Sequence, residues 1–270
     1  MQKSKDSDSA YIGGTILIHY FFRGKLTEKG RGNFFFSDSS VRILLKNMND
    51  HLLDNPVWNS LSQTHKRFAI DHDTVKFYQP DYCPFGGFIG QEDIADLIRK
   101  YADLTSNFFI VGDKPAIPDN LIIKNELVCL QMIIADKIQI KQSNNIVRLT
   151  GQHRKALYEL VNLVQPGYFK KNTFLLGDYF GIFDGKELIA ITGERMKMND
   201  FTEVSAVITH PSYTGMGYAK QLVAHEVNHT LQQKKMPFLH VAETNIPAIT
   251  LYEGLGFKRS RKISFWNISQ

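Results

Sequence analysis

The sequence predicts a mixed α/β protein, with a central sheet flanked by helices and preceded by a second, smaller α/β domain. Two observations carry this prediction. After residue 146, strand-like and helix-like segments follow one another in an order that completes a small α/β domain within about 125 residues. Before residue 135, apolar runs of strand length alternate with segments of helical periodicity, which indicates another mixed unit. The length of 270 residues agrees with two domains that each bury a core.

The chain divides into three parts. Residues 1–33 are polar or glycine-containing around one apolar run, and they form an N-terminal arm of unknown role. Residues 34–135 form the N-terminal α/β domain, and a polar linker at 137–145 leads to the C-terminal domain, residues 146–270. The elements expected in the N-terminal domain include a strand at 75–78, a helix at 91–101 and strands at 108–111 and 127–130.

The ends of several elements in the C-terminal domain are marked by proline and glycine residues. Pro166-Gly167 ends a helix, and Asp184-Gly185 marks a hairpin between two strands. In chain order, we expect a strand at 146–149, a helix at 156–164, strands at 179–183, 186–196 and 203–209, a long helix after Gly217, a strand at 238–242, a helix at 245–253 and a final strand pair.

Composition and charge exclude several classes of protein. The net charge is +5, but both signs are interspersed, and the longest basic cluster covers only residues 258–262, so we expect no nucleic-acid partner. Cys83 and Cys129 show neither metal spacing nor a disulfide framework, which favours a reducing compartment. The apolar run at 11–22 is shorter than the ~20 residues of a membrane helix and lacks signal-peptide features. We therefore expect a soluble, cytoplasmic protein without a membrane partner, and its oligomeric state stays open.

The stretch from His210 to His229 contains two competing signatures. Its second half, His225-Glu-Val-Asn-His229, has the H-E-x-x-H spacing of zinc proteases, in which Glu226 would polarise water. On a helical wheel at ~100° per residue, both histidines lie about 200° from the apolar stripe of this helix. We therefore expect the two histidines to face solvent and no metal to bind, and a zinc hydrolase is only a third alternative.

The first half of the same stretch is a glycine turn between a strand and a helix. A β-branched run ends at Thr209, His210-Pro211 stops the strand, and Gly215 and Gly217 lie just before the amphipathic helix. Glycines let a phosphate approach the backbone, and the first N–H groups of a helix have no intrahelical acceptor. The helix dipole adds to the attraction of an anion. The sequence therefore favours a phosphate site over a zinc site.

Two separated motifs resemble those of the GNAT superfamily of acetyl-CoA-dependent N-acetyltransferases. The stretch Thr214-Gly-Met-Gly-Tyr-Ala219 is similar to the phosphate-binding pattern Gln/Arg-x-x-Gly-x-Gly/Ala, with Thr214 in place of Gln or Arg. The stretch from Asn245 to Phe257 is similar to Asn-x-x-Ala-x-x-Leu-Tyr-x-x-x-Gly-Phe. The resemblance covers 146–270 and implies a GNAT-like mixed central sheet flanked by helices. Gln165-Pro-Gly-Tyr and Gly193-Glu-Arg also resemble a subgroup with an extra N-terminal domain.

The resemblance implies that acetyl-CoA is the co-substrate. Its pyrophosphate would lie on the amides of the glycine turn, and its pantetheine arm would lie along the strand edge before that turn. The change at Thr214 removes one side-chain contact but leaves these amides. The cofactor-binding residues implied in this way are Val207, Ile208, Thr209, Gly215, Met216, Gly217, Tyr218, Ala219 and Lys220. Asn245 is a further candidate for cofactor contact, with helix capping as the alternative.

In this family the acceptor amine attacks the thioester directly, so the amine must first lose a proton. At pH 7 this costs about 4.6 kcal/mol for a lysine amine of pKa ~10.4 and about 1.4 kcal/mol for an α-amine of pKa ~8. Glu203 matches a position where some members have a base, and strand alternation would place it on the face of Ser205 and Val207. His240 on the next strand is the second candidate, alone or with Glu203 through water. For both, an ordinary salt-bridged or packed residue is the alternative.

Tyr252 matches the residue that usually acts as the acid and protonates the departing thiolate. A phenol of pKa ~10 is protonated at pH 7 and suits this task. The alternative is a core tyrosine on the side of the helix that carries Leu251 and Leu255.

The function expected from the sequence is therefore transfer of an acetyl group from acetyl-CoA to a primary amine of a small molecule or a peptide. The acceptor itself is not identified. The alternative is a catalytically inactive acyl-CoA-binding regulatory module. A degenerate copy of the same fold is a further possibility for the first domain, but Phe85-Gly86-Gly87-Phe88, which precedes its helix, follows no clear strand.

Overall fold

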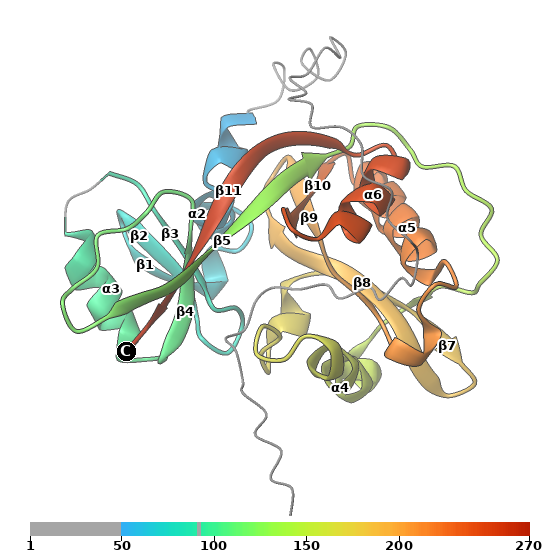
Figure 1. Cartoon of the computed structure of the whole chain (residues 1–270), viewed down its shortest axis with the longest axis horizontal. Coiled ribbons are helices and arrows are strands. Elements are labelled where there is room, and N and C mark those ends of the chain that lie inside the picture. Colours follow the sequence, from blue (N-terminus) through green and yellow to red (C-terminus); the bar gives the residue numbers. More distant parts are fainter. Residues whose placement is uncertain (1–49, 91–92) are drawn as a thin grey trace, which may run out of the picture.

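The computed structural model describes residues 50–90 and 93–270 (Figure 1). The predicted N-terminal arm and the first part of the N-terminal domain lie outside these residues. The strands are β1 Ala69–His72, β2 Val75–Tyr78, β3 Phe85–Phe88, β4 Asn107–Val111, β5 Ile122–Ile133, β6 Val147–Arg148, β7 Tyr179–Asp184, β8 Glu187–Lys197, β9 Phe201–Thr209, β10 Met236–Ala242 and β11 Lys258–Ser269. The α-helices are α2 Pro56–Ser62, α3 Ile94–Ala102, α4 Arg154–Val164, α5 Tyr218–Gln232 and α6 Ile246–Gly254.

The described strands form one sheet in the order β1-β2-β3-β4-β11-β5-β10-β9-β8-β7-β6. Helices cover both faces, as alternate residues of β10 show. Phe238 packs in the cluster that contains Val57 of α2, whereas Leu239 and Val241 pack in the cluster that contains residues of α5 and α6. The predicted fold class, a mixed central sheet flanked by helices, is confirmed.

The long strands β5 and β11 connect the two halves of the sheet (Figure 1). β5 pairs with β10 on one side and with β11 on the other, and β11 also pairs with β4. The strand β5, from the predicted N-terminal domain, thus lies between β10 and β11, from the predicted C-terminal domain. One sheet therefore contains strands from both predicted domains. The expected final strand pair is wrong, because β11 is a single strand and β5 occupies the place beside β10.

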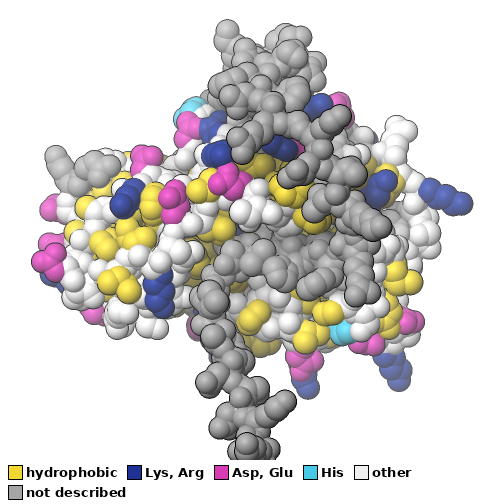
Figure 2. All heavy atoms as spheres, in the orientation of Figure 1, with side chains coloured by type: hydrophobic (Ala, Val, Ile, Leu, Met, Phe, Trp, Pro, Cys, Tyr) yellow, Lys and Arg dark blue, Asp and Glu magenta, His cyan; other side chains and the backbone are white. Residues whose placement is uncertain are grey.

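Surface charge follows no single sign on the face shown in Figure 2, where Lys/Arg and Asp/Glu side chains are interspersed. Among the described helices, none has the length together with the apolar character that a membrane crossing demands.

The Gly-Gly pair of Phe85-Gly86-Gly87-Phe88, for which the sequence predicts no element, lies in the buried strand β3. A Cβ on Gly86 would lie 2.3 Å from Cδ1 of Phe77, and a Cβ on Gly87 would lie 2.7 Å from Oδ1 of Asn55. The glycines are therefore required by close packing of a ring and a helix on the strand, not by a turn. β1, β3 and α2 are elements that the sequence patterns do not predict.

Substitution of Gly86 by alanine is expected to lower the free energy of unfolding by about 1–3 kcal/mol, the range for overpacked cores. Phe77 cannot give way easily, because its ring is stacked on Tyr101 at a centroid distance of 3.9 Å. Urea denaturation of the native chain and of Gly86→Ala measures the effect. Gly151→Ala is the control, because a Cβ there meets nothing within 4 Å. Equal midpoints for Gly86→Ala and the native chain would contradict the packing argument.

Candidate active site

The sheet opens between β9 and β10. Their parallel ladder joins Met236–Phe238 to Phe201–Glu203 and ends there. Beyond this point β10 continues beside β5, and β9 continues beside β8. The edge of β9 from Val204 to Thr209 therefore separates from β10, and it leads directly to the glycine turn.

The glycine turn has the backbone that the sequence predicts. Gly215 and Gly217 have φ values of 79° and 78°, and a Cβ on either would meet nothing within 4 Å. Gly217 is the N-cap of α5, whose first amides, from Tyr218 onward, have no intrahelical acceptor. In the described part of the chain, Gln221 has the first amide of this helix with a backbone acceptor, the carbonyl of Gly217 at 3.3 Å. The turn thus offers an uncrowded row of N–H donors at the positive end of a helix.

The edge of β9 contains a β-bulge. Between the pairs Gly193–Ser205 and Ile191–Ile208, β9 has one residue more than β8. Ala206 takes up the difference with φ 50°, a conformation that costs a non-glycine residue roughly 1–2 kcal/mol. Backbone strain of this kind concentrates at functional sites.

Because of the bulge, the side chain of Glu203 lies on the opposite face of the sheet from the one that the sequence predicts. Simple alternation would place Glu203 on the same face as Val207, but the extra residue reverses the alternation between them. Val207 packs with α5 and α6, whereas Glu203 contacts Arg195, whose guanidinium lies 4.7 Å from the ring centre of Phe85 on the opposite face. The side chain of Glu203 thus lies on one face of the sheet, and the side chain of Val207, on the predicted pantetheine-binding edge, lies on the other.

The other predicted cofactor residues surround the opening. Val207, Ala219 and Tyr252 share one apolar cluster, which joins β9, α5 and α6. Ile208 packs on the opposite face, in the cluster of α4, and Thr209 ends the strand. The remaining turn residues are Met216, which is exposed, and Lys220, which lies in the first turn of α5.

Two predicted residues belong to α6 and the segment before it. Asn245 is the N-cap of α6, and its side chain accepts from the amide of Ala248 at 3.2 Å, so the capping role is present in the structure. Tyr252 is buried and packs edge-on against Phe257 at a centroid distance of 5.8 Å. It lies in the same cluster as Val207, which places its helix beside the free edge of β9.

Glu203 forms a buried bidentate ion pair with Arg195. Nε and Nη2 of Arg195 donate to the two carboxylate oxygens of Glu203 at 2.7 and 2.6 Å. Burial by itself would raise the pKa of Glu203, but the charge and hydrogen bonds of Arg195 outweigh it and hold the pKa at about 2. Glu203 is therefore ionised at neutral pH and is a weak proton acceptor.

His240 is oriented by the same carboxylate. Its Nδ1 lies 2.8 Å from Oε1 of Glu203, and its Nε2 lies 3.1 Å from Nε2 of Gln131. An ionised carboxylate only accepts hydrogen bonds, so these partners assign the proton to Nδ1 and the lone pair to Nε2. The amide of Gln131 also donates to the carbonyl of Leu53 at 2.9 Å. A buried polar chain thus runs Arg195–Glu203–His240–Gln131 at the point where β9 and β10 separate.

Arg195 and Gln131 are members of this chain that the sequence did not identify. Arg195 belongs to the quoted stretch Gly193-Glu-Arg, but nothing in that stretch indicates its partner. Gln131 is the single polar residue within the apolar run 127–134 of β5, and a buried polar residue in such a run requires hydrogen bonds. That interruption was a usable signal.

The two cysteines are not placed for nucleophilic chemistry. Both are buried, and burial raises the pKa of Cys83 and of Cys129 to about 12. A thiol that stays protonated at neutral pH does not form an acyl-enzyme readily.

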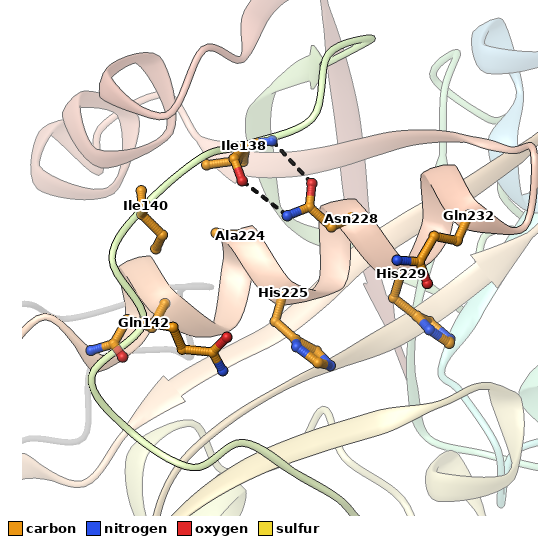
Figure 3. Close-up of a pocket in the computed structure, with 9 residues that line it drawn as sticks. Ile138, Ile140, Gln142, Ala224, His225, Asn228, His229 and Gln232 are labelled. Atoms are coloured by element: carbon orange, nitrogen blue, oxygen red, sulfur yellow. Dashed lines mark hydrogen bonds between the residues drawn. The ribbon is translucent and has the colours of Figure 1, made fainter.

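The two histidines of the H-E-x-x-H stretch do not face open solvent as expected. His225 and His229 are half-buried, and their rings pack edge-on against Phe180 at centroid distances of 4.5 and 5.0 Å. β7 explains the difference, because Phe180 of this strand packs against both rings. The segment after β5 contacts α5 at Asn228. The side chain of Asn228 accepts from the amide of Ile138 and donates to its carbonyl, as Figure 3 shows.

Comparisons with known proteins agree with this architecture. The family model for FR47-like proteins matches residues 179–266. A solved GNAT-family protein from Novosphingobium aromaticivorans superposes with a TM-score of 0.74 and 27% identity, covering 82% of this chain and 99% of its own. No curated protein matches the chain significantly.

Two more distant structures share the fold. A GCN5-related N-acetyltransferase-like protein from Streptococcus suis has a TM-score of 0.56 and 14% identity, covering 83% of this chain and 99% of its own. A GCN5-related N-acetyltransferase from Kribbella flavida has a TM-score of 0.52 and 11% identity, covering 87% of this chain and 96% of its own.

The fold is therefore shared with solved proteins of the GNAT family. The part of the chain from β7 to β11 is FR47-like. The resemblance to the GNAT superfamily that the two sequence motifs indicate is confirmed.

Proposed function

We propose that this protein is an acetyl-CoA-dependent N-acetyltransferase that acts on a primary amine of a small molecule or a peptide. One observation carries the proposal. The ladder between β9 and β10 stops at Glu203, and the free edge of β9 runs into a glycine turn that caps α5. This arrangement combines a strand edge for an extended amide-containing chain with a helix N-terminus for phosphates.

The residues of the turn fit the proposed co-substrate. The amides from Gly215 to Lys220 would hold its pyrophosphate, and the open space at both glycines admits phosphate oxygens close to the backbone. The edge from Val207 to Thr209 would bind the amides of the pantetheine arm. When bound, acetyl-CoA supplies the acetyl group as a thioester that an amine can attack.

In this proposal His240 is the proton acceptor and Glu203 positions it. A carboxylate with a pKa of about 2 is poorly matched to an amine, whereas an imidazole nitrogen with a lone pair is a common general base. Glu203 holds the proton on Nδ1, which leaves the lone pair of Nε2 for the incoming proton. The amide of Gln131 must release Nε2 at that moment, and it keeps its bond to the carbonyl of Leu53.

The departing thiolate needs a proton, and Tyr252 is the proposed donor. Its helix shares an apolar cluster with Val207 of β9, which supports this assignment. Asn245 fixes the start of this helix through its cap. The role of Asn245 is therefore proposed as positioning of α6, with cofactor contact as the alternative.

The second candidate function is an acyl-CoA-binding module without turnover. The engagement of both ring nitrogens of His240 favours it, because such a network also stabilises a fold without doing chemistry. The residue Thr214 also favours the binding module, because it lacks the side-chain contact with phosphate that Gln or Arg would make. Its hydroxyl donates to the carbonyl of Pro211 instead. Both candidates predict acetyl-CoA binding, and only the enzyme predicts release of free thiol.

The deciding experiment measures thiol release from acetyl-CoA with a panel of primary amines, including polyamines, α-amino groups of peptides and lysine side chains. We expect amine-dependent release by the native chain. Saturable binding of acetyl-CoA without release on any amine would favour the binding module.

His240→Gln is expected to lower kcat by ~10²–10⁴-fold, the usual contribution of a general base. The loss should shrink as the pH of the assay rises, because the free amine becomes available without a base. The affinity for acetyl-CoA should change little. Steady-state kinetics between pH 6.5 and 9.5 measure both quantities. A uniform loss at all pH values would indicate a structural role for His240.

Tyr252→Phe is expected to lower kcat while acetyl-CoA affinity is retained, because only the phenolic proton is removed. A thiol analogue with a better leaving group should restore the rate of the variant more than that of the native chain. Equal relative rates with both thioesters would exclude Tyr252 as the acid.

A further inference from the structure

A second cluster of ligating side chains lies under the C-terminal half of α5. One atom each from Asp178, Glu194 and His229 lies within 4.8 Å of the others. Asp178 precedes β7, Glu194 lies in β8 and His229 lies in the last turn of α5, so the fold gathers them from three elements. Glu194 is completely buried, and the side chains of Asp178 and His229 are each about a quarter exposed.

This cluster contains buried carboxylate oxygens that lack a partner. Within the described residues, Oε1 of Glu194 and Oε2 of Glu226 make no hydrogen bond. Glu226 lies three residues before His229, which places both on one face of α5. Unpartnered buried oxygens of this kind call for a ligand or a proton.

Two neighbouring cations each contact one carboxylate oxygen of the cluster. Nζ of Lys197 lies 2.5 Å from Oε2 of Glu194, and Nη2 of Arg148 lies 2.6 Å from Oδ1 of Asp178. Of the other carboxylate oxygens, Oε1 of Glu194 has no partner in the described part of the chain, and Oδ2 of Asp178 faces Nε2 of His229. Lys235 lies farther out and donates to the carbonyl of Met198.

The contacts of His229 also point to a ligand. Its Nε2 lies 3.0 Å from Oδ2 of Asp178 and 2.7 Å from Nε2 of Gln233. One ring nitrogen cannot donate to the carboxylate and accept from the amide at the same time. A cation between Nε2 and the carboxylate oxygens removes the need for a proton on Nε2, and the side chain of Gln233 then turns away, because its amide nitrogen cannot donate to a ring nitrogen that binds the cation.

We propose that Asp178, Glu194 and His229 bind one divalent transition-metal ion, of which Zn²⁺ is the best match. One imidazole nitrogen and two carboxylate oxygens are a ligand set that Zn²⁺ uses at bond lengths of about 2.0–2.2 Å. Mg²⁺ favours an all-oxygen shell and is a poor match. The ion would tie α5 to β7 and β8.

The site is separate from the proposed acetyl-transfer site. His229 lies twelve residues beyond Gly217, which is about 18 Å along the helix at 1.5 Å per residue. Access to the cluster is available from two cavities. One of about 260 Å³ is lined by His225 and His229 (Figure 3), and one of about 350 Å³ is lined by Asp178 and Arg148.

His225 provides a matched control for this proposal. It is the other histidine of H-E-x-x-H, on the same helix and also packed on Phe180, but it is not a member of the cluster. A zinc-protease arrangement would need both histidines. The proposed site needs His229 and replaces His225 by the two carboxylates.

The test uses the full chain without an affinity tag, freed of metal by chelation and desalted. Calorimetric titration should give one Zn²⁺ per chain, and Mg²⁺ should give no signal. A hundredfold excess of Zn²⁺ over Kd should raise Tm by about 5–10 °C. His229→Gln and Asp178→Asn should each weaken Zn²⁺ binding by at least the ~10–100-fold that outer-shell changes cause, and His225→Gln by less than about threefold. Circular dichroism checks that each variant is folded.

Two results would contradict a zinc ion at Asp178, Glu194 and His229. Absence of Zn²⁺ binding by the folded native chain overturns the proposal. Equal losses in His225→Gln and His229→Gln also overturn it, because they would place the ion on the histidine pair at the surface of α5. None of these measurements requires acetyl-CoA or an amine, so they do not depend on the proposed function.

Discussion

The variant Gly217→Glu is expected to lose acetyl-CoA binding, with Kd rising at least ~100-fold. The native chain should bind with a micromolar Kd, which corresponds to about 8 kcal/mol. At Gly217 a side chain has open space, so the glutamate will not disturb the packing. Its carboxylate will occupy the positive end of α5 and repel the pyrophosphate. The loss of one or two charge-assisted hydrogen bonds, at ~1.5–3 kcal/mol each, accounts for the magnitude. Isothermal titration calorimetry measures it.

Two controls isolate the anion site from backbone strain. Gly217→Ala imposes the same φ of 78° on a residue with a Cβ, at a cost of roughly 1–2 kcal/mol in stability, but adds no charge. It should retain binding within about fivefold. Gly167→Glu places the same side chain at another positive-φ glycine with open space, after α4, and should bind like the native chain. If the folded native chain does not bind acetyl-CoA, the glycine turn has only a structural role, and the proposed acetyltransferase function is contradicted.

The glycine turn and the order of the elements along the chain around it were predictable, because both depend on local sequence. Strand, proline stop, glycine pair and amphipathic helix follow one another within about thirty residues, and each has its own residue signature. The same holds for β2, whose observed bounds, Val75–Tyr78, are those predicted.

Contacts between distant segments were not predictable from local patterns. β5 reads as an apolar strand, but nothing in it indicates that it inserts between β10 and β11. The bulge at Ala206 has no sequence signal either, because alanine rarely adopts a positive φ. The facing of Glu203 was mispredicted for this reason. The sequence therefore did not predict the hydrogen-bond partners of Glu203, although Arg195 lies only eight residues before it.

The second large effect concerns the stability of the folded chain at low pH. Glu203 has a folded pKa of about 2 against an ordinary value of 4.5, so the folded chain binds fewer protons at this site than the unfolded chain does. Its contribution is fully present above about pH 4.5 and is lost as the pH falls from there toward 2. The shift corresponds to about 3 kcal/mol. Urea denaturation at several pH values between 2 and 7 should show this fall in the free energy of unfolding with decreasing pH, which we call the acid slope.

Glu203→Gln should remove most of that slope and should lower the free energy of unfolding at pH 7 by about 3–5 kcal/mol, because it leaves the guanidinium of Arg195 buried without its counterion. The matched control is Glu253→Gln, which breaks the ion pair with Arg259. Those side chains are 43% and 51% exposed, so the control should cost less than about 1 kcal/mol. Similar losses in the two variants would contradict the buried network, and so would an unchanged acid slope in Glu203→Gln. A network that holds Glu203 ionised in this way also keeps the proton on Nδ1 of His240, so the stability measurement and the pH profile of catalysis examine the same contact.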